Sequence, residues 1–229
     1  MFSSTIKFLQ RILGLRNPEP KGKRKAEEWY GRYWRLRIDQ LERDEFAQKV
    51  TSALAERFGS DLNLSVLITA HRDLEVRVLA AIKAGLELDS DCESALIAAI
   101  MDESESLYNS AAKSLCSLGT VRGLSSIVVI SKVSRGLRAA AARMLQDFGP
   151  DARDAIPALM ALGVGTAQSF ALAAIGEAAV PYLQVAIRTG KHEVECALAL
   201  REIGLATEDD KRIIHAILEA TGLLDSDDG

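Results

Sequence analysis

Histidine and cysteine, the residues most often found in metal centres, are few and scattered in this chain of 229 residues. Cys92, Cys116 and Cys196 form no CxxC pair and have no neighbouring histidine, so neither a zinc site nor a disulfide framework is indicated. Of the three histidines, only His192 stands beside an acid, Glu193. We therefore expect no metal, no cofactor and no catalytic centre.

Aromatic and basic side chains are concentrated in one short segment near the N-terminus. It contains both tryptophans and two of the four tyrosines, with arginines between and after them. Stacking and phosphate contacts by such residues are typical of a nucleic-acid site, and aromatic belts occur at membrane interfaces. The alternative is an end cap over the first repeat of a helical array, and we favour it because such an array must be closed. The candidate residues are Trp29, Tyr33, Trp34, Arg35 and Arg37.

The chain before this segment is a basic arm on an acidic body. Residues 1–43 carry 11 Lys or Arg against five Asp or Glu, whereas the remainder carries 17 against 27. Apolar residues at helical spacing lie opposite Lys7 and Arg11, a pattern that fits an anionic membrane surface. A tail, a helix packed on a partner and a mitochondrial targeting peptide stay open as alternatives. The candidate residues are Phe2, Ile6, Leu9, Leu13, Lys21, Lys23, Arg24 and Lys25.

A third feature is an almost uncharged segment. From residue 155 to residue 187, Glu177 is the only charged residue, although 26% of the chain is charged. Prolines and glycines interrupt the segment, which argues against a membrane span. We expect its exposed sides to contact a protein partner or a second copy of this chain, with Phe170 and Tyr182 as anchors.

The elements that position these residues follow from a repeat. The chain is rich in Ala and Leu, with 5% aromatic residues and five prolines, which favours close-packed helices. A phrase of the form Leu-x-x-apolar-Gly recurs, ending at Gly119, Gly149, Gly176 and Gly204. Each glycine is expected to supply the left-handed C-cap that ends a helix. Asp89 and Gly59 continue the same phase toward the N-terminus.

Each repeat contains two helices according to its apolar pattern. Before each of the four glycines, a leucine four residues back and mostly small residues seven and eight back form one stripe, where a neighbouring helix approaches closely. Pro157 and Pro181 fit the first turns of helices. Between these helices lie second apolar segments: 64–68, 95–101, 124–130, 156–162, 180–187 and 213–218.

The phrases AIPALMALG, AAVPYLQVAI and DLEVRVLAA, the last with Arg77 before paired alanines, resemble short HEAT repeats. The resemblance covers roughly residues 46–220 and is to the short variety found in phycobilin lyase subunits. It implies an all-α, right-handed α-solenoid, armadillo-like, of about five to six helix pairs with an N-terminal capping helix. The expected organisation is a flexible basic arm over residues 1–26, the solenoid over 27–224 and an acidic tail over 225–229.

Such solenoids mostly serve as curved binding surfaces, so we expect a non-enzymatic scaffold or adaptor that holds a protein partner. One alternative implied by the resemblance is a lyase- or chaperone-type subunit acting on a phycobiliprotein-like client. Nucleic-acid binding is a further alternative, disfavoured because the acidic body repels phosphate. His192 occupies a repeat position held elsewhere by apolar residues, so we expect a half-buried structural histidine.

Compartment is inferred from the cysteines and the N-terminus. Unpaired cysteines suit a reducing environment, and Lys7 and Arg11 interrupt the apolar runs that a secretory signal needs. We therefore expect a cytoplasmic protein, and peripheral membrane association through residues 1–25 stays open as an alternative.

Overall fold

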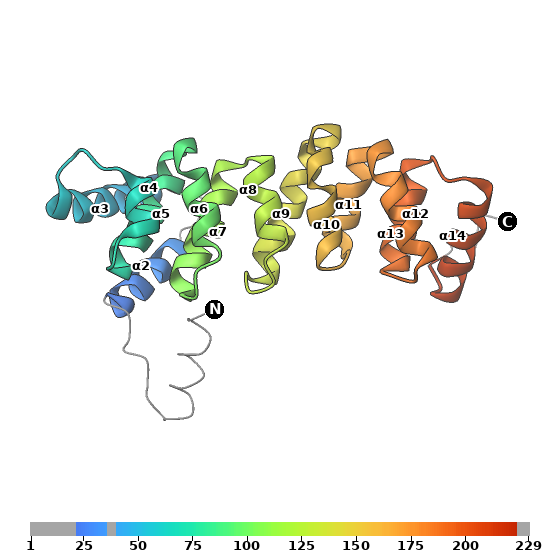
Figure 1. Cartoon of the computed structure of the whole chain (residues 1–229), viewed down its shortest axis with the longest axis horizontal. Coiled ribbons are helices and arrows are strands. Elements are labelled where there is room, and N and C mark those ends of the chain that lie inside the picture. Colours follow the sequence, from blue (N-terminus) through green and yellow to red (C-terminus); the bar gives the residue numbers. More distant parts are fainter. Residues whose placement is uncertain (1–21, 36–39, 224–229) are drawn as a thin grey trace, which may run out of the picture.

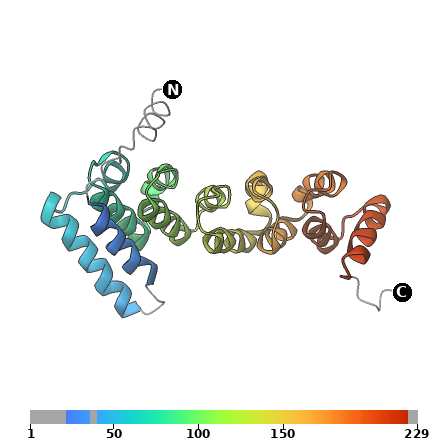
Figure 2. The same ribbon diagram turned by 90° about the horizontal axis from the view of Figure 1, so that it is seen from below.

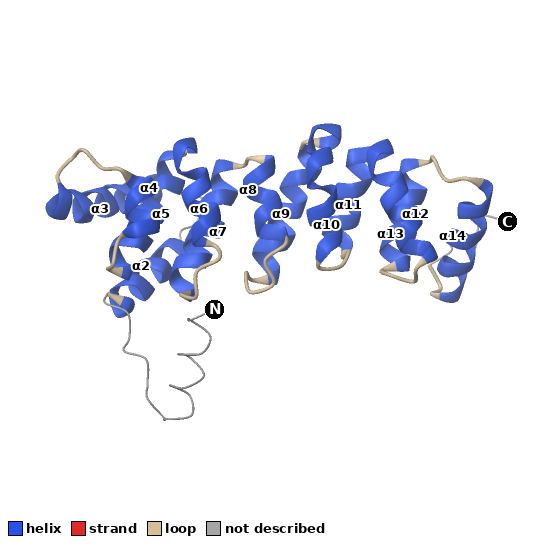
Figure 3. Cartoon of the chain, in the orientation of Figure 1, coloured by secondary structure: helices blue, strands red, loops and turns tan. Residues whose placement is uncertain are grey.

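The structure, a computed structural model, describes residues 22–35 and 40–223, with side chains placed for 22–31 and 43–223. These residues form only helices, turns and short connections (Figure 3). The α-helices are α2 (Lys23–Arg35), α3 (Gln40–Phe58), α4 (Leu64–Ala70), α5 (Leu74–Glu87), α6 (Glu93–Ala99), α7 (Glu105–Leu118), α8 (Val121–Val128), α9 (Arg135–Asp147), α10 (Ile156–Ala161), α11 (Thr166–Ile175), α12 (Val180–Arg188), α13 (Glu193–Ile203) and α14 (Glu208–Ala220). The 3₁₀ turns are η1 (Ser90–Cys92), η2 (Gly149–Ala155) and η3 (Gly176–Ala179).

The helices stand in a row that follows the chain order (Figure 1). From α4 to α13 they form antiparallel pairs, and each pair packs mainly on the pair before and the pair after it. The first helices of the pairs make one layer and the second helices, α5, α7, α9, α11 and α13, make the other (Figure 2). The predicted all-α class is confirmed, and all six predicted second segments fall on helices.

Glycines supply the predicted left-handed C-caps of α7 and α13. At α9 the prediction of Gly149 is wrong by one residue, because the C-cap is Phe148 in the right-handed region and Gly149 starts η2. Gly119 and Gly204 are C-caps with φ of 64° and 75°, and Gly176 has φ of 79°.

Extending the repeat spacing toward the N-terminus placed a helix end at Asp89. The left-handed C-cap of α5 lies one residue earlier, at Leu88, with φ of 55°. A side chain with a Cβ atom adopts this conformation at a cost.

Small residues let successive second-layer helices come close together. The two alanines of the stripe in α7, Ala111 and Ala112, are fully buried. Gly85 of α5 lies against Ser114 of α7 so closely that an added Cβ atom would sit 2.4 Å from the serine Oγ. That hydroxyl in turn donates a 2.8 Å hydrogen bond to the carbonyl oxygen of Ala81. Contact at this distance requires Gly, Ala or Ser on both helices.

One arginine ties two neighbouring pairs together by polar contacts. Arg77 of α5 donates through Nε to the carbonyl oxygen of Ile68, the last buried residue of α4, at 2.8 Å. Its Nη1 lies 2.9 Å from Oδ2 of Asp102, in the turn before α7. Asp102 also accepts a hydrogen bond from the backbone N–H of Ser104. Arg77 thus links α4 and α5 to the next pair.

The aromatic helix α2 packs on the row, but at a different place from the predicted end cap. It lies along α5 and α7 of the second layer, while α3 packs on α5 (Figure 2). It therefore spans two neighbouring pairs instead of covering only the first. Helix α2 begins at Lys23, within the arm predicted for residues 1–26, and its Ala26 is fully buried. The predicted acidic tail over 225–229 lies outside the described residues.

At the other end, a buried aspartate holds the last helix, α14, in place. Asp210 and Thr207 form a capping box at the start of α14, and the same carboxylate accepts hydrogen bonds from Gln184 and Arg188 of α12 at 2.7 Å and 3.0 Å. Burial alone would raise the pKa of Asp210, but these hydrogen bonds outweigh it and the pKa is lowered. The ionised form is therefore the one that stabilises the docked helix.

Replacing Asp210 with Asn should release α14. The pKa of Asp210 in the folded protein is lowered from the ordinary value of 3.8. The stability that this carboxylate contributes is therefore fully present above the ordinary carboxyl range, and it is lost as the pH falls through the lower native pKa. We expect Asp210→Asn to cost about 1–3 kcal/mol at neutral pH. Amide hydrogen exchange of α14 measures this.

The matched control is Asp209→Asn, an exposed first-turn residue whose carboxylate lies 3.6 Å from Arg212. Its effect should be small at every pH. Equal exchange rates in the two variants would contradict the role given to Asp210.

Candidate binding surfaces

Trp29, the one candidate of the aromatic segment whose side chain is described, faces the interior of the fold. Its ring centroid lies 6.0 Å from that of Phe46 of α3, and its Nε1 donates a 3.3 Å hydrogen bond to Oε1 of Glu75. Tryptophan used in this way closes the packing between three helices. The side chains of Tyr33, Trp34 and Arg35, and the whole of Arg37, lie outside the described residues.

Glu75, at the start of α5, is the polar joint of this N-terminal region. Only 5% of it is exposed, and besides Trp29 it binds Arg57 of α3, whose Nη2 lies 2.8 Å from Oε2. One carboxylate therefore joins α2, α3 and α5. A buried carboxylate that loses one of its two donors is left with an unsatisfied charge, which costs stability. Displacing either α2 or α3 therefore weakens the contact of the other, so the positions of the two helices are coupled.

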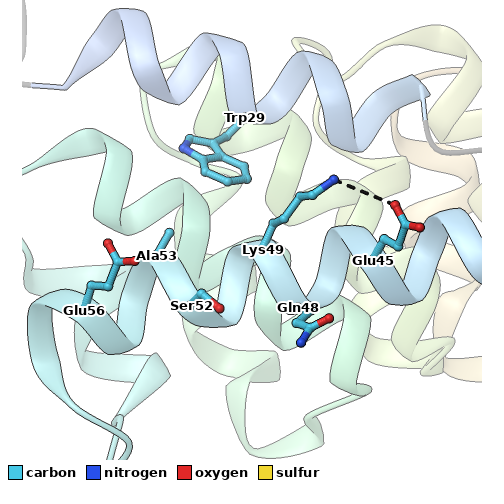
Figure 4. A pocket seen from close by; sticks show the side chains of 7 residues that line it. All are labelled: Trp29, Glu45, Gln48, Lys49, Ser52, Ala53 and Glu56. Carbon is cyan, nitrogen blue, oxygen red and sulfur yellow. Dashed lines mark ion pairs between the residues drawn. The ribbon is translucent and has the colours of Figure 1, made fainter.

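A shallow hollow of about 500 Å³ lies between α2 and α3 (Figure 4). Trp29 overhangs it from α2, and the remaining lining comes from α3. Lys49 points along the hollow toward Glu45, at 3.8 Å, and both side chains are more than half exposed. Because its cation is already paired and its walls are open, this hollow offers no set of convergent groups for a ligand.

The membrane candidates are placed only in part. Lys23, Arg24 and Lys25 form the first turn of α2, where Arg24 lies 3.5 Å from Glu28. The apolar candidates Phe2, Ile6, Leu9 and Leu13, and Lys21, lie outside the described residues. The membrane interpretation of the arm stays a prediction.

Phe170 and Tyr182, predicted as anchors of one surface, are both exposed, at 54% and 47%. Phe170 belongs to α11 in the second layer, whereas Tyr182 belongs to α12 in the first (Figure 2). The groove that Phe170 lines, between α11 and α13, does not include Tyr182. The structure does not bring them into one patch.

Phe170 lines a groove between α11 and α13. The groove has a volume of about 260 Å³, with apolar walls from Phe170, Ala173 and Leu198. Charged side chains from α13 border it: Glu195, Arg201 and Glu202. An apolar floor with a charged rim is the arrangement found in protein interfaces.

Residues 166–188 together are apolar and long enough to cross a membrane by composition. In the fold they are interrupted at Gly176, whose left-handed φ starts the turn η3, so that α11 has ten residues and α12 nine. A single span needs about 20 helical residues. As folded here, the segment forms the end of one pair and the start of the next.

No three His, Cys, Asp or Glu side chains gather in a way that could hold a metal ion anywhere in the described part of the chain. Burial raises the pKa of the Cys92, Cys116 and Cys196 thiols to about 11, so near neutral pH they lack the thiolate needed for nucleophilic chemistry. His192 corrects the sequence expectation. It is exposed and left-handed, with φ of 51°, because it forms the N-cap of α13 instead of a buried position.

His192 lines a cavity together with three residues that the sequence analysis missed, Arg135, Arg138 and Arg143 of α9. A signal for them does exist in the sequence. Between Glu105 and Asp147 there is no acid, while six Lys or Arg occur, in a body that is acidic as a whole. Counting charge over the whole body concealed this local excess.

Comparison with known proteins adds no assignment. No protein-family model matches the chain, and no curated protein is significantly similar to it.

Glu75→Gln tests the joint of the N-terminal helices. Glutamine preserves the shape but removes the charge that pairs with Arg57, so we expect a loss of about 1–2 kcal/mol and faster amide exchange in α2 and α3. Glu87→Gln, in the same helix, is the control, because its ion pair with Lys83 joins adjacent turns and has a half-exposed carboxylate. Unchanged amide exchange in α2 after Glu75→Gln would show that the contacts of the Glu75 carboxylate are not needed to hold α2 in place.

Proposed function

We propose that this chain is a HEAT-like α-solenoid that acts as a non-enzymatic binding module and holds a segment of a protein partner on its second layer, between α11 and α13. The observation that carries this proposal is the groove lined by Phe170. An exposed phenylalanine ring over small apolar neighbours, with charges at the border, fits a partner's apolar side chain.

The solenoid assignment is supported by the pairs themselves. Successive pairs repeat the same Ala and Leu stripe, end on left-handed residues and contact mainly their neighbours. A stack of this kind presents the outer sides of its second-layer helices as one extended surface.

The fold contains its own example of a helix bound to this surface. Helix α2 lies along the outer sides of α5 and α7 and buries Ala26 there. Among the described residues, no helix occupies the corresponding place on α9, α11 and α13. We infer that a helix or extended segment of another protein takes that place, with Phe170 as the central contact.

The position of the groove also agrees with the charge distribution. Its helix α11 lies wholly within the nearly uncharged segment 155–187. Surface helices without charge lose little solvation when they are covered, so binding here costs less than on the charged helices of the row.

Phe170→Asp tests the proposal, with Tyr182→Ser as the matched control. Because the two residues belong to helices of different layers and only Phe170 lines the groove, Phe170→Asp should abolish recovery of the partner, while Tyr182→Ser should leave recovery unchanged. Recovery is measured by affinity purification from the source cells, followed by a direct titration of the purified partner. Circular dichroism checks that both variants keep their helices.

Three outcomes contradict the proposal. If Tyr182→Ser abolishes binding and Phe170→Asp does not, the partner uses the first layer. If both variants bind as before, the groove is not the site. If only this chain is recovered and its self-association depends on Phe170, the occupant is a second copy and not another protein.

A further inference from the structure

A cavity of about 430 Å³ opens where the N-terminal ends of three second-layer helices meet. Arg135 and Arg138 line it from the first turns of α9, and Arg143 from further along that helix. The opposite wall is the turn from Leu162 to Thr166, and His192 contributes from the start of α13. The turns that join the helices of these pairs lie along one edge of the row (Figure 3).

The positive charge in this cavity is not compensated. In the described residues, Arg135, Arg138 and Arg143 have neither an ion pair nor a hydrogen bond through their side chains, and no acid is among the residues that line the cavity. The structural arginines of the fold behave differently. Arg57, Arg77 and Arg188 each contact a carboxylate within 3.0 Å. Arg138 is half-buried, and Arg135 and Arg143 are exposed at the mouth. Three arginines that line one cavity without a counterion can bind an oxyanion.

Two of the three helix ends add to this positive field, whereas α13 carries Glu193 and Glu195 in its first turn, outside the lining of the cavity. The first turns of α9 and α11 contain no acid, whereas α5 and α7 carry Glu75 and Glu105 there. Gly165, the N-cap of α11, has no side chain that could accept from the free backbone N–H groups. Arginine near a helix N-terminus opposes the helix dipole, so α9 also gains from a bound anion at this place.

Gly163 shapes the wall of the cavity. It has φ of 102°, and an added Cβ atom would sit 2.6 Å from Cε1 of His192. Glycine therefore allows the imidazole to lie against the turn, where its ring nitrogens border the same space as the arginines. Apolar side chains of Val128, Ala139 and Leu162 complete the lining.

We propose that this cavity binds a phosphate monoester, with Arg135, Arg138 and Arg143 holding the phosphoryl oxygens and the apolar wall contacting the esterified group. The volume exceeds what a bare phosphate ion needs, which favours a monoester over inorganic phosphate. The site stands apart from the proposed partner groove in its chemistry, and it does not depend on that function.

The test is a titration of the full chain, labelled with ¹⁵N, with phenyl phosphate and separately with inorganic phosphate. The amide signals of Gly163 and Gly165 report on the turn itself. We expect saturable shifts of both signals, with tighter binding of phenyl phosphate than of inorganic phosphate. The double variant Arg135→Gln/Arg138→Gln should weaken phenyl phosphate binding by about tenfold or more.

The matched control is Arg153→Gln, which replaces an exposed arginine in η2 outside the cavity. It should bind phenyl phosphate like the unaltered chain. Shifts of the same size in sodium chloride at equal ionic strength would overturn the site, as would unchanged affinity in the double variant. Equal affinities for the two phosphates would overturn the assignment to a monoester.

Discussion

The close approach of neighbouring second-layer helices is the constraint on which the rest of this structure depends. A single helix pair cannot bury its own apolar stripe, so each pair is stabilised by the next. The contact between Gly85 and Ser114 shows how little room there is, since even one methyl group would overlap the serine. Alanine and leucine fill the corresponding positions further along the row. Because this packing uses the sides of the helices, their outer faces stay available for other contacts.

At both ends of the row, a buried carboxylate joins helices by accepting hydrogen bonds from a neighbouring helix. Glu75 joins α2 and α3 to α5, and Asp210 joins α14 to α12. A terminal pair has only one neighbour, so apolar packing alone gives its outermost helix less stability than a central one receives. Charge-assisted hydrogen bonds make up part of that difference and fix the position of the helix.

The sequence was most informative where one residue type decides the backbone. Gly119, Gly176 and Gly204 ended their helices as predicted, because glycine adopts the left-handed region without a steric penalty. Leu88 and His192 adopt the same region against their own preference, so composition could not reveal them.

Candidate sites were harder to predict than helices, because they depend on which outer faces meet. Phe170 and Tyr182 are close in sequence, yet the alternation of layers separates them. Trp29 was recognised as notable, but its partners, Phe46 and Glu75, come from two other helices. Arg135, Arg138 and His192 converge only because successive helix N-termini lie at one edge of the row.

The most direct test of this account is Gly85→Ala, followed by amide hydrogen exchange resolved for each helix. The added methyl must push α5 and α7 apart, at a cost of about 1–3 kcal/mol. If pairs are stabilised mainly by their neighbours, protection should fall in α2, α5 and α7 and be retained in α13 and α14. An equal loss of protection in every helix, or no loss in any, would contradict it.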